Sequence, residues 1–286
     1  MNLTEKGANN PIAGEGFIVT TRDCEFLGEI FSQSFTAEEV AHRIELERTH
    51  LRQAEIKRGL ERSRRRFLSL MKRWGVALGQ LAPLHAEGKT QHLMGLLRGG
   101  EADQRRAKLW LNDKNHADGY FAEEKNTAFL LAGPDFLKHY GKPWQLERLY
   151  LHERFHGAGH PGTERGFGGG VVEEGWVEYL AKKYSVHGET EELERDMREM
   201  GDSMRGENFD FLGYNTDLLE TIMRHGNLSE QDLILAFFHG QTAPLRERLN
   251  RTFGPGSASV LMEDGLPLKQ RAYLPTGKMN ELVYSR

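Results

Sequence analysis

The sequence has a single cysteine and little net charge, and these two shortages exclude several kinds of protein. Cys24 is the only cysteine among 286 residues, so these residues can form neither an internal disulfide nor a zinc site built from several thiolates. The net charge of −4 is small for this length. It gives no electrostatic reason to expect nucleic acid or an acidic membrane as the main partner, and we predict neither.

Long apolar runs are also missing. No segment approaches the roughly 20 apolar residues that a membrane-spanning helix needs. Residues 1–7 have neither the basic start nor the apolar core of a secretory signal. The sequence therefore predicts a soluble protein that is cytoplasmic or is exported without a cleaved signal peptide.

The N-terminal part of the chain is dominated by helical patterns. Residues 1–35 are rich in Gly, Asn, Thr and Ser, and we expect them to be irregular or to form a single strand. The segment Thr36–Glu39 has the pattern of a helix-capping box and opens a long helical region. Two shorter helices are expected at residues 92–97 and 103–111.

A concentrated basic run, Arg62–Arg66, lies within the long helical region. Such a run could bind phosphates. Glutamates nearby in the sequence balance its charge, however, and we interpret the run as a solvated helix face.

The C-terminal half combines a little strand pattern with more helix. Residues 120–121 and 126–131 are predicted strands, and Gly133-Pro134 ends the second of them. Further helical segments are expected at residues 189–204, 209–226, 228–239 and 243–253. The Pro- and Gly-containing residues 255–286 are expected to form an extended tail.

The segment Leu151–His156 contains a pattern with a defined chemistry. His152 and His156 are four residues apart, so on a helix they lie on one face, close enough to bind one metal ion. Glu153 projects beside them. On a helix, His-Glu-x-x-His supplies two imidazoles to Zn²⁺ and a carboxylate that accepts a proton from a metal-bound water.

A hydrolytic zinc site needs a third protein ligand and one open position. His160-Pro161-Gly162 and the Gly-rich run Gly166–Gly170 end the first motif helix and let the chain reverse. Glu174 and Glu178 are four residues apart and share one face of the next helix. We predict that Glu174 binds the metal and that Glu178 accepts a ring N–H from a ligand histidine.

Two other residues compete with Glu174 for the third ligand position. Glu173 would face the metal if the second helix were rotated by one residue, but Val177 would then take the place of Glu178. His160 resembles the third histidine of the metzincin pattern, although it lies two residues before the position that this pattern requires, which Gly162 occupies.

The two motifs together resemble those of the gluzincin metallopeptidases. Glu-Gly-Trp-Val-Glu-Tyr at Glu174–Tyr179 is similar to the Glu-Gly-aromatic-x-x-Tyr signature of the aminopeptidase branch. The acidic residue four positions after the ligand resembles the thermolysin branch, with Glu178 in place of an aspartate. The loop between the motifs is one residue shorter than the usual aminopeptidase spacing. The resemblance covers roughly residues 115–250.

This resemblance implies roles for individual residues. His152, His156 and Glu174 would bind zinc, Glu153 would be the general base, and Glu178 would hydrogen-bond a ligand. It also implies that strand Ala128–Leu131, just before the metal helix, could bind an extended peptide through its backbone. The oxyanion of the reaction needs a donor downstream, and Tyr214 is preferred over His187, His225 and His239.

These patterns together predict an α+β, mostly helical fold. It consists of a helical N-terminal region (1–115), a zincin-like catalytic lobe with a small sheet, an active-site helix and helical C-terminal segments (116–254), and the extended tail (255–286). The predicted function is that of a Zn²⁺-dependent metallopeptidase acting on a peptide or protein substrate. The alternatives are a zinc hydrolase of a non-peptide bond and a structural-zinc protein whose N-terminal region binds a partner.

Overall fold

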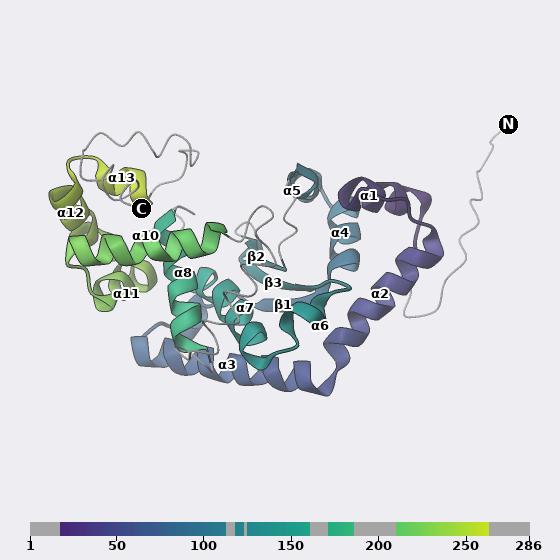
Figure 1. Cartoon of the computed structure of the whole chain (residues 1–286), viewed down its shortest axis with the longest axis horizontal. Coiled ribbons are helices and arrows are strands. Elements are labelled where there is room, and N and C mark those ends of the chain that lie inside the picture. Colours follow the sequence, from purple (N-terminus) through teal and green to yellow (C-terminus); the bar gives the residue numbers. More distant parts are fainter. Residues whose placement is uncertain (1–17, 113–117, 123–124, 161–170, 186–209, 263–286) are drawn as a thin grey trace. The chain divides into compact units, whose positions relative to one another are not determined.

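The computed structural model describes residues 18–112, 118–122, 125–160, 171–185 and 210–262. These residues are mostly helical and include one three-stranded sheet with the strand order β1-β3-β2 (Figure 1). The predicted α+β, mostly helical class is therefore confirmed. The predicted helix at residues 189–204 lies outside the described residues.

The chain divides into two compact units, each assembled from three segments. Unit 1 comprises Met1–Gly59, His85–Tyr120 and Phe129–Pro143, and unit 2 comprises Leu60–Leu84, Phe121–Ala128 and Trp144–Arg286. The sequence instead predicts the consecutive ranges 1–115, 116–254 and 255–286. The difference arises because the chain passes from one unit to the other inside helices and strands, where no change of composition marks the passage.

Unit 1 contains an N-terminal helix that the sequence patterns did not predict. Its helices are α1 (Thr21–Phe31), α2 (Ala37–Arg52), α4 (Lys89–Arg98), α5 (Glu101–Asn112) and the short α6 (Phe136–Tyr140). The expectation of irregular chain or a strand at residues 1–35 is wrong for α1. A capping box between Thr20 and Asp23 starts this helix, and Leu27 and Ile30 bury its apolar side. The predicted capping box of Thr36 and Glu39 is confirmed.

The sheet consists of β1 (Leu84–Gly88), β2 (Gly119–Ala122) and β3 (Thr127–Ala132). Strands β2 and β3 agree with the prediction. Strand β1 was missed because its sequence, Leu-His-Ala-Glu-Gly, contains no β-branched residue. Strand β3 is fully buried and lies between the other two, so it is not an edge strand. The expectation that Ala128–Leu131 could bind a peptide through its backbone is therefore wrong, because both neighbouring strands use that backbone.

Unit 2 is a helical assembly around an aromatic core. Its helices are most of α3 (Ala54–Trp74), the one-turn η1 (Leu78–Gln80), α7 (Pro143–His156), α8 (Val171–Tyr184), α10 (Asp210–Gly226), α11 (Glu230–His239), α12 (Thr242–Phe253) and α13 (Ser257–Met262). Five aromatic side chains in this core are almost inaccessible to solvent, namely Phe67, Phe155, Trp176, Phe237 and Phe238. The predicted helical C-terminal segments are thus present.

The predicted extended tail begins as a helix. Ala258, Leu261 and Met262 of α13 are buried in the core of unit 2, and Pro255-Gly256 forms the turn before this helix. The prediction of extended structure is wrong for residues 257–262, because burial of apolar side chains outweighs the turn-forming composition around them. Residues 263–286 lie outside the described part of the chain.

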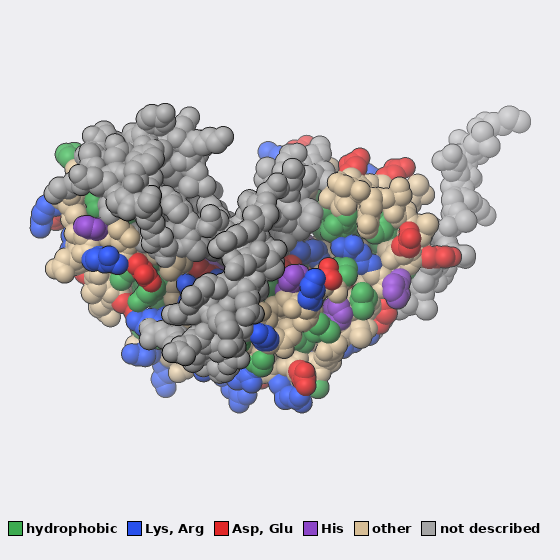
Figure 2. Space-filling model, in the orientation of Figure 1, with side chains coloured by type: hydrophobic (Ala, Val, Ile, Leu, Met, Phe, Trp, Pro, Cys, Tyr) green, Lys and Arg blue, Asp and Glu red, His purple; other side chains and the backbone are tan. Residues whose placement is uncertain are grey.

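Helix α3 carries the basic run on its outer side. Arg62, Arg64 and Arg65 are exposed, and Figure 2 shows Lys and Arg side chains along the edge where Figure 1 places α3. Arg64 lies 3.7 Å from Glu61, and Arg66 lies 2.7 Å from the buried Glu147 of α7.

The helices of the described chain do not include one that is both long and apolar enough to cross a membrane.

Candidate metal centre

Helix α7 carries two histidines, His152 and His156, whose side chains are largely buried. Pro143 occupies the first turn, where its missing N–H costs nothing. Leu151 and Phe155 pack into the core of unit 2 and fix the rotation of the helix. Arg148, His152 and His156 follow one another at intervals of four residues, so they form one line along α7.

Helix α8 brings carboxylates to the same place. Trp176, Val177 and Leu180 are inaccessible to solvent and fix the helix against the core. Its first turn carries Glu173 and Glu174. Glu178 follows one turn later and is also buried. One helix thus supplies imidazoles and the other supplies acids.

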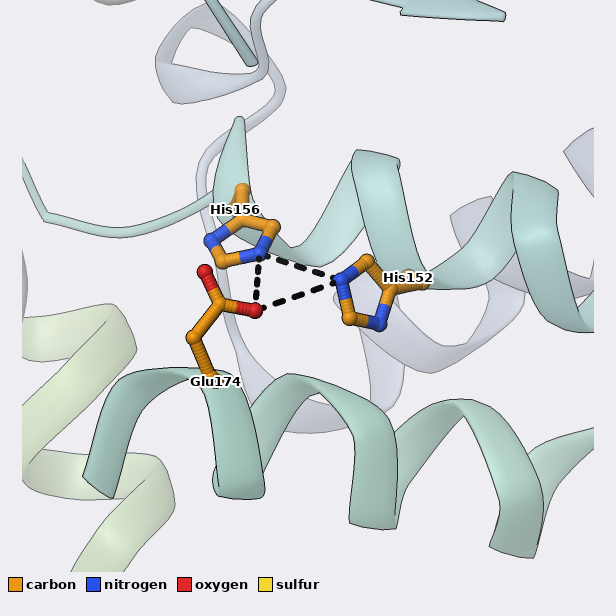
Figure 3. A group of neighbouring side chains, drawn as sticks. All are labelled: His152, His156 and Glu174. Carbon is orange, nitrogen blue, oxygen red and sulfur yellow. Dashed lines mark hydrogen bonds and ion pairs between the residues drawn. The ribbon is translucent and has the colours of Figure 1, made fainter. Parts of the chain in front are cut away.

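Three ligand atoms from the two helices converge (Figure 3). The Nε2 atoms of His152 and His156 lie 3.3 Å apart, and each lies 3.6 Å from Oε2 of Glu174. Ligand atoms at about 2.0–2.2 Å from a tetrahedral zinc ion lie about 3.3–3.6 Å from one another. The spacing therefore fits one ion, and these three side chains could hold a metal.

The other ring nitrogen of each histidine lies beside a second carboxylate. His152 Nδ1 is 3.0 Å from Oε2 of Glu178, and His156 Nδ1 is 2.9 Å from Oε1 of Glu173. Because each Nδ1 donates its hydrogen to a carboxylate, Nε2 is the ring nitrogen that faces Glu174 and that can bind a metal once it is deprotonated. The structure thus places Glu174 beside the histidine Nε2 atoms and Glu178 beside a ring Nδ1, which are the positions that their predicted roles require.

Two residues around the centre make contacts that the sequence patterns do not predict. The patterns make Glu173 a rival ligand, whereas its Oε1 lies 2.9 Å from His156 Nδ1. They give no role to Arg148, whose Nε lies 2.5 Å from Oε1 of Glu178. The spacing of four residues between Arg148 and His152 was the available signal, but it does not reveal which acid lies between them.

Electrostatics favour positive charge at the centre. Burial disfavours a charged imidazole, but hydrogen bonds to Glu174 and Glu178 outweigh it and raise the pKa of His152 to about 9. The pKa of His156 is also raised well above its ordinary value, because Glu174 and Glu173 overcome the same burial. Burial opposes ionisation of Glu174, but the two histidines lower its pKa. These shifts favour protonated imidazoles in the metal-free centre, so a metal cation competes with protons for the two rings.

Glu153 has the properties of a base rather than of a ligand. It is buried, and burial raises the pKa of its carboxyl to about 7, while the charges of His152 and His156 oppose this rise. It is not part of the ligand group. A carboxyl with this pKa can take up and release a proton near neutral pH.

The remaining candidates lie elsewhere. Tyr214 belongs to α10, which packs against α8, but the position of its side chain is outside what the structure describes, as is all of His187. His239 Nε2 is 2.8 Å from the carbonyl oxygen of Trp74, and His225 is exposed in the last turn of α10. The ring of His160 packs against Gly240, and His160 is not among the converging ligands.

No known family model, curated protein or solved structure matches this chain.

Proposed function

We propose that the protein is a zinc-dependent metallopeptidase of the gluzincin type, which acts on a peptide or protein substrate. The observation that carries the proposal is the convergence of His152, His156 and Glu174 at 3.3 and 3.6 Å. Two imidazole nitrogens and one carboxylate oxygen are a donor set that suits a catalytic zinc ion.

The arrangement supports hydrolysis rather than a purely structural ion. A structural zinc site is closed by four protein ligands, whereas the ligand group among the described residues has three members. Glu153, whose pKa burial raises to about 7 in the metal-free centre, supplies the base that hydrolysis needs. Both features are those of a centre that binds water and moves a proton.

The chemistry divides between the ion and the residues around it. Zinc, when bound, makes a water molecule more acidic and polarises the carbonyl group of the scissile bond. The Glu153 carboxylate accepts the proton of the attacking water and passes it to the nitrogen of the leaving amine. Glu173 and Glu178 keep the two imidazoles in the orientation that presents Nε2. Tyr214 remains our candidate for the donor to the oxyanion.

Metal analysis and peptide cleavage with a Glu153→Gln variant test the proposal. The wild-type protein is expected to retain one equivalent of zinc after dialysis and to cleave members of a peptide library. Glu153→Gln is expected to retain the zinc and to lower kcat by about 10²–10⁴-fold, because the general base is lost while the ligands remain. Metal content by mass spectrometry and cleavage rates are the two measurements.

The same experiment separates the alternatives. A Glu153→Gln protein with zinc and full activity refutes the role of Glu153. Stoichiometric zinc without cleavage of any peptide, together with unfolding on chelation, identifies a structural zinc protein. Zinc-dependent turnover of esters or non-peptide amides, with no peptide cleaved, identifies a different hydrolase.

A further inference from the structure

Arg148 is a buried cation that the hydrolytic chemistry does not use. It lies on α7, one turn before His152, and its side chain is 10% exposed. An arginine is seldom buried to this extent unless it is paired. Its Nε donates to Oε1 of Glu178 at 2.5 Å, and Nη2 contacts the same oxygen. Two nitrogens of the guanidinium therefore contact the same oxygen of this carboxylate.

Glu178 uses its two oxygens for different partners. Oε1 accepts from Arg148, and Oε2 lies 3.0 Å from Nδ1 of His152. Glu178 itself is 2% exposed, so bulk water does not compete for either oxygen. The carboxylate group is planar, so a rotation that releases Oε1 also moves Oε2 away from the imidazole.

We propose that Arg148 is a positioning residue of the metal centre, which fixes the carboxylate of Glu178 and, through it, the imidazole of His152. The inference rests on the proposed function in that the centre binds zinc. The three side chains form a chain of contacts that starts on α7, crosses to α8 and returns to α7. It holds a ligand in place without touching the ion or the substrate.

The chemistry of the contact explains why arginine is needed. Removing the guanidinium leaves a buried carboxylate whose Oε1 has lost both contacts, and this carboxylate can rotate toward any other donor. His152 Nδ1 then loses a fixed acceptor, and the ring loses the orientation that presents Nε2. Partners of this kind change metal affinity by about 10–100-fold when they are removed.

A second arginine on a neighbouring helix provides a matched control. Arg66 of α3 lies 2.7 Å from Oε1 of Glu147, a fully buried carboxylate of α7 that directly precedes Arg148. Glu147 points about 140° away from His152 around the helix axis, since each residue turns the helix by about 100°. Arg66→Met therefore also removes a cationic partner of a buried glutamate on α7, but on another side of the helix; it removes the hydrogen bond from Arg66 Nη1 to the carbonyl oxygen of Tyr184 as well.

The experiment measures Zn²⁺ dissociation constants by competition with a chelator, using the full chain without substrate. The proteins are the wild type, Arg148→Met, Glu178→Gln, the double variant and Arg66→Met. We expect Arg148→Met to weaken zinc binding by about 10-fold and Arg66→Met to change it by less than about 2-fold. Because Arg148 acts through Glu178, the double variant should bind zinc no more weakly than Glu178→Gln alone.

Visible absorption of the Co²⁺-loaded proteins provides a readout that general destabilisation would not move. The bands should shift in Arg148→Met and stay at the wild-type positions in Arg66→Met. If Arg148→Met does not fold, Arg148→Lys replaces it, because lysine keeps the positive charge but cannot contact Oε1 with two nitrogens. A smaller loss of zinc affinity is then expected. Wild-type affinity in Arg148→Met, or in Arg148→Lys if the methionine variant does not fold, overturns the proposal. Losses that multiply in the double variant overturn it as well.

Failure of this inference differs from failure of the proposed function. If the wild type binds zinc but cleaves no peptide, the peptidase proposal is wrong and the proposed role of Arg148 still stands. If the wild type cleaves peptides and Arg148→Met keeps full zinc affinity, only the proposed role of Arg148 is wrong. A wild-type protein that binds no zinc overturns both.

Discussion

Each unit of the protein contains a buried histidine beside a glutamate, but the second ring nitrogen is used differently. In unit 1, His92 has Nδ1 2.6 Å from Glu87 and Nε2 2.7 Å from the hydroxyl of Tyr120. In unit 2, His152 has Nδ1 on Glu178, while its Nε2 faces His156 and Glu174. A carboxylate on Nδ1 is thus not diagnostic of a metal site.

The convergence of the Nε2 atoms is the distinguishing feature. His92 has protein partners for both nitrogens, and its ring lies 4.7 Å from the ring of Phe129, so it ties strands and helix together. In the candidate metal centre, two imidazole nitrogens and a carboxylate oxygen meet at distances that suit a shared cation. This convergence of possible ligand atoms on the second ring nitrogen, and not the carboxylate on the first, separates the candidate site from the structural network of unit 1.

The largest effect is expected when one histidine of each unit is replaced by alanine, in two separate variants. His156→Ala should lose stoichiometric zinc after dialysis and all peptide cleavage, because two ligands no longer retain the ion. His92→Ala should keep one equivalent of zinc and lose about 1–3 kcal/mol of unfolding free energy, because buried polar partners are left unsatisfied. Mass spectrometry and chemical denaturation measure the two outcomes, and loss of zinc from His92→Ala would contradict the distinction.

A smaller effect is expected from pH. The folded-state pKa of His152 is about 9 against an ordinary 6.5, as hydrogen bonds to Glu174 and Glu178 exceed the opposing effect of burial. Its contribution to stability is thus complete below about pH 6.5 and is lost as pH rises through 9. Burial raises the pKa of Glu153 to about 7, and this shift also favours the folded state more at lower pH. The metal-free protein should therefore have a lower Tm at pH 9.5 than at pH 7.

The zinc-loaded protein is the control for that prediction. Its imidazoles are neutral ligands across this range, so the decline in Tm should shrink once zinc is bound. Thermal unfolding at several pH values, with chelator and with zinc, gives the two curves. Parallel curves would show that the histidines do not carry the pH dependence.

The smallest effect is expected from a substitution that removes one hydrogen bond of His92 in unit 1. Tyr120→Phe removes the hydroxyl that lies 2.7 Å from His92 Nε2 and keeps the ring that stacks on Phe129. The free energy of unfolding should fall by about 1 kcal/mol, the usual net value of one hydrogen bond. Zinc affinity should not change. A drop in zinc affinity would argue that the network of unit 1 influences the metal centre.

Local patterns predicted the helices of the site, because their signals lie within a few residues. Pro143 starts α7, and the interval between His152 and His156 places both histidines on one face. The run of glycines in the sequence before Val171 predicts a break between the two helices. The interval between Glu174 and Glu178 likewise gave one ligand candidate and one hydrogen-bonding partner. These inferences need only the geometry of a single helix.

Other features depend on how segments far apart in the chain meet. Arg148 and Glu173 acquire their roles only when α7 and α8 pack in one rotational setting, which periodicity does not specify. Strand β1 exists because β3 pairs with it, although its own residues are poor strand formers. Helix α13 likewise forms where a core accepts its apolar side chains. Sequence patterns of single elements do not contain such partners.

The number of acids on α8 has a consequence for which ions the centre can accept. With both imidazoles neutral and Glu153 protonated, the positive charges of one divalent cation and of Arg148 together equal the negative charges of Glu173, Glu174 and Glu178. Ionisation of the buried Glu153 adds one further negative charge. A monovalent ion would leave more negative charge uncompensated in either state, so the acids around the two histidines favour a divalent ion over a monovalent one.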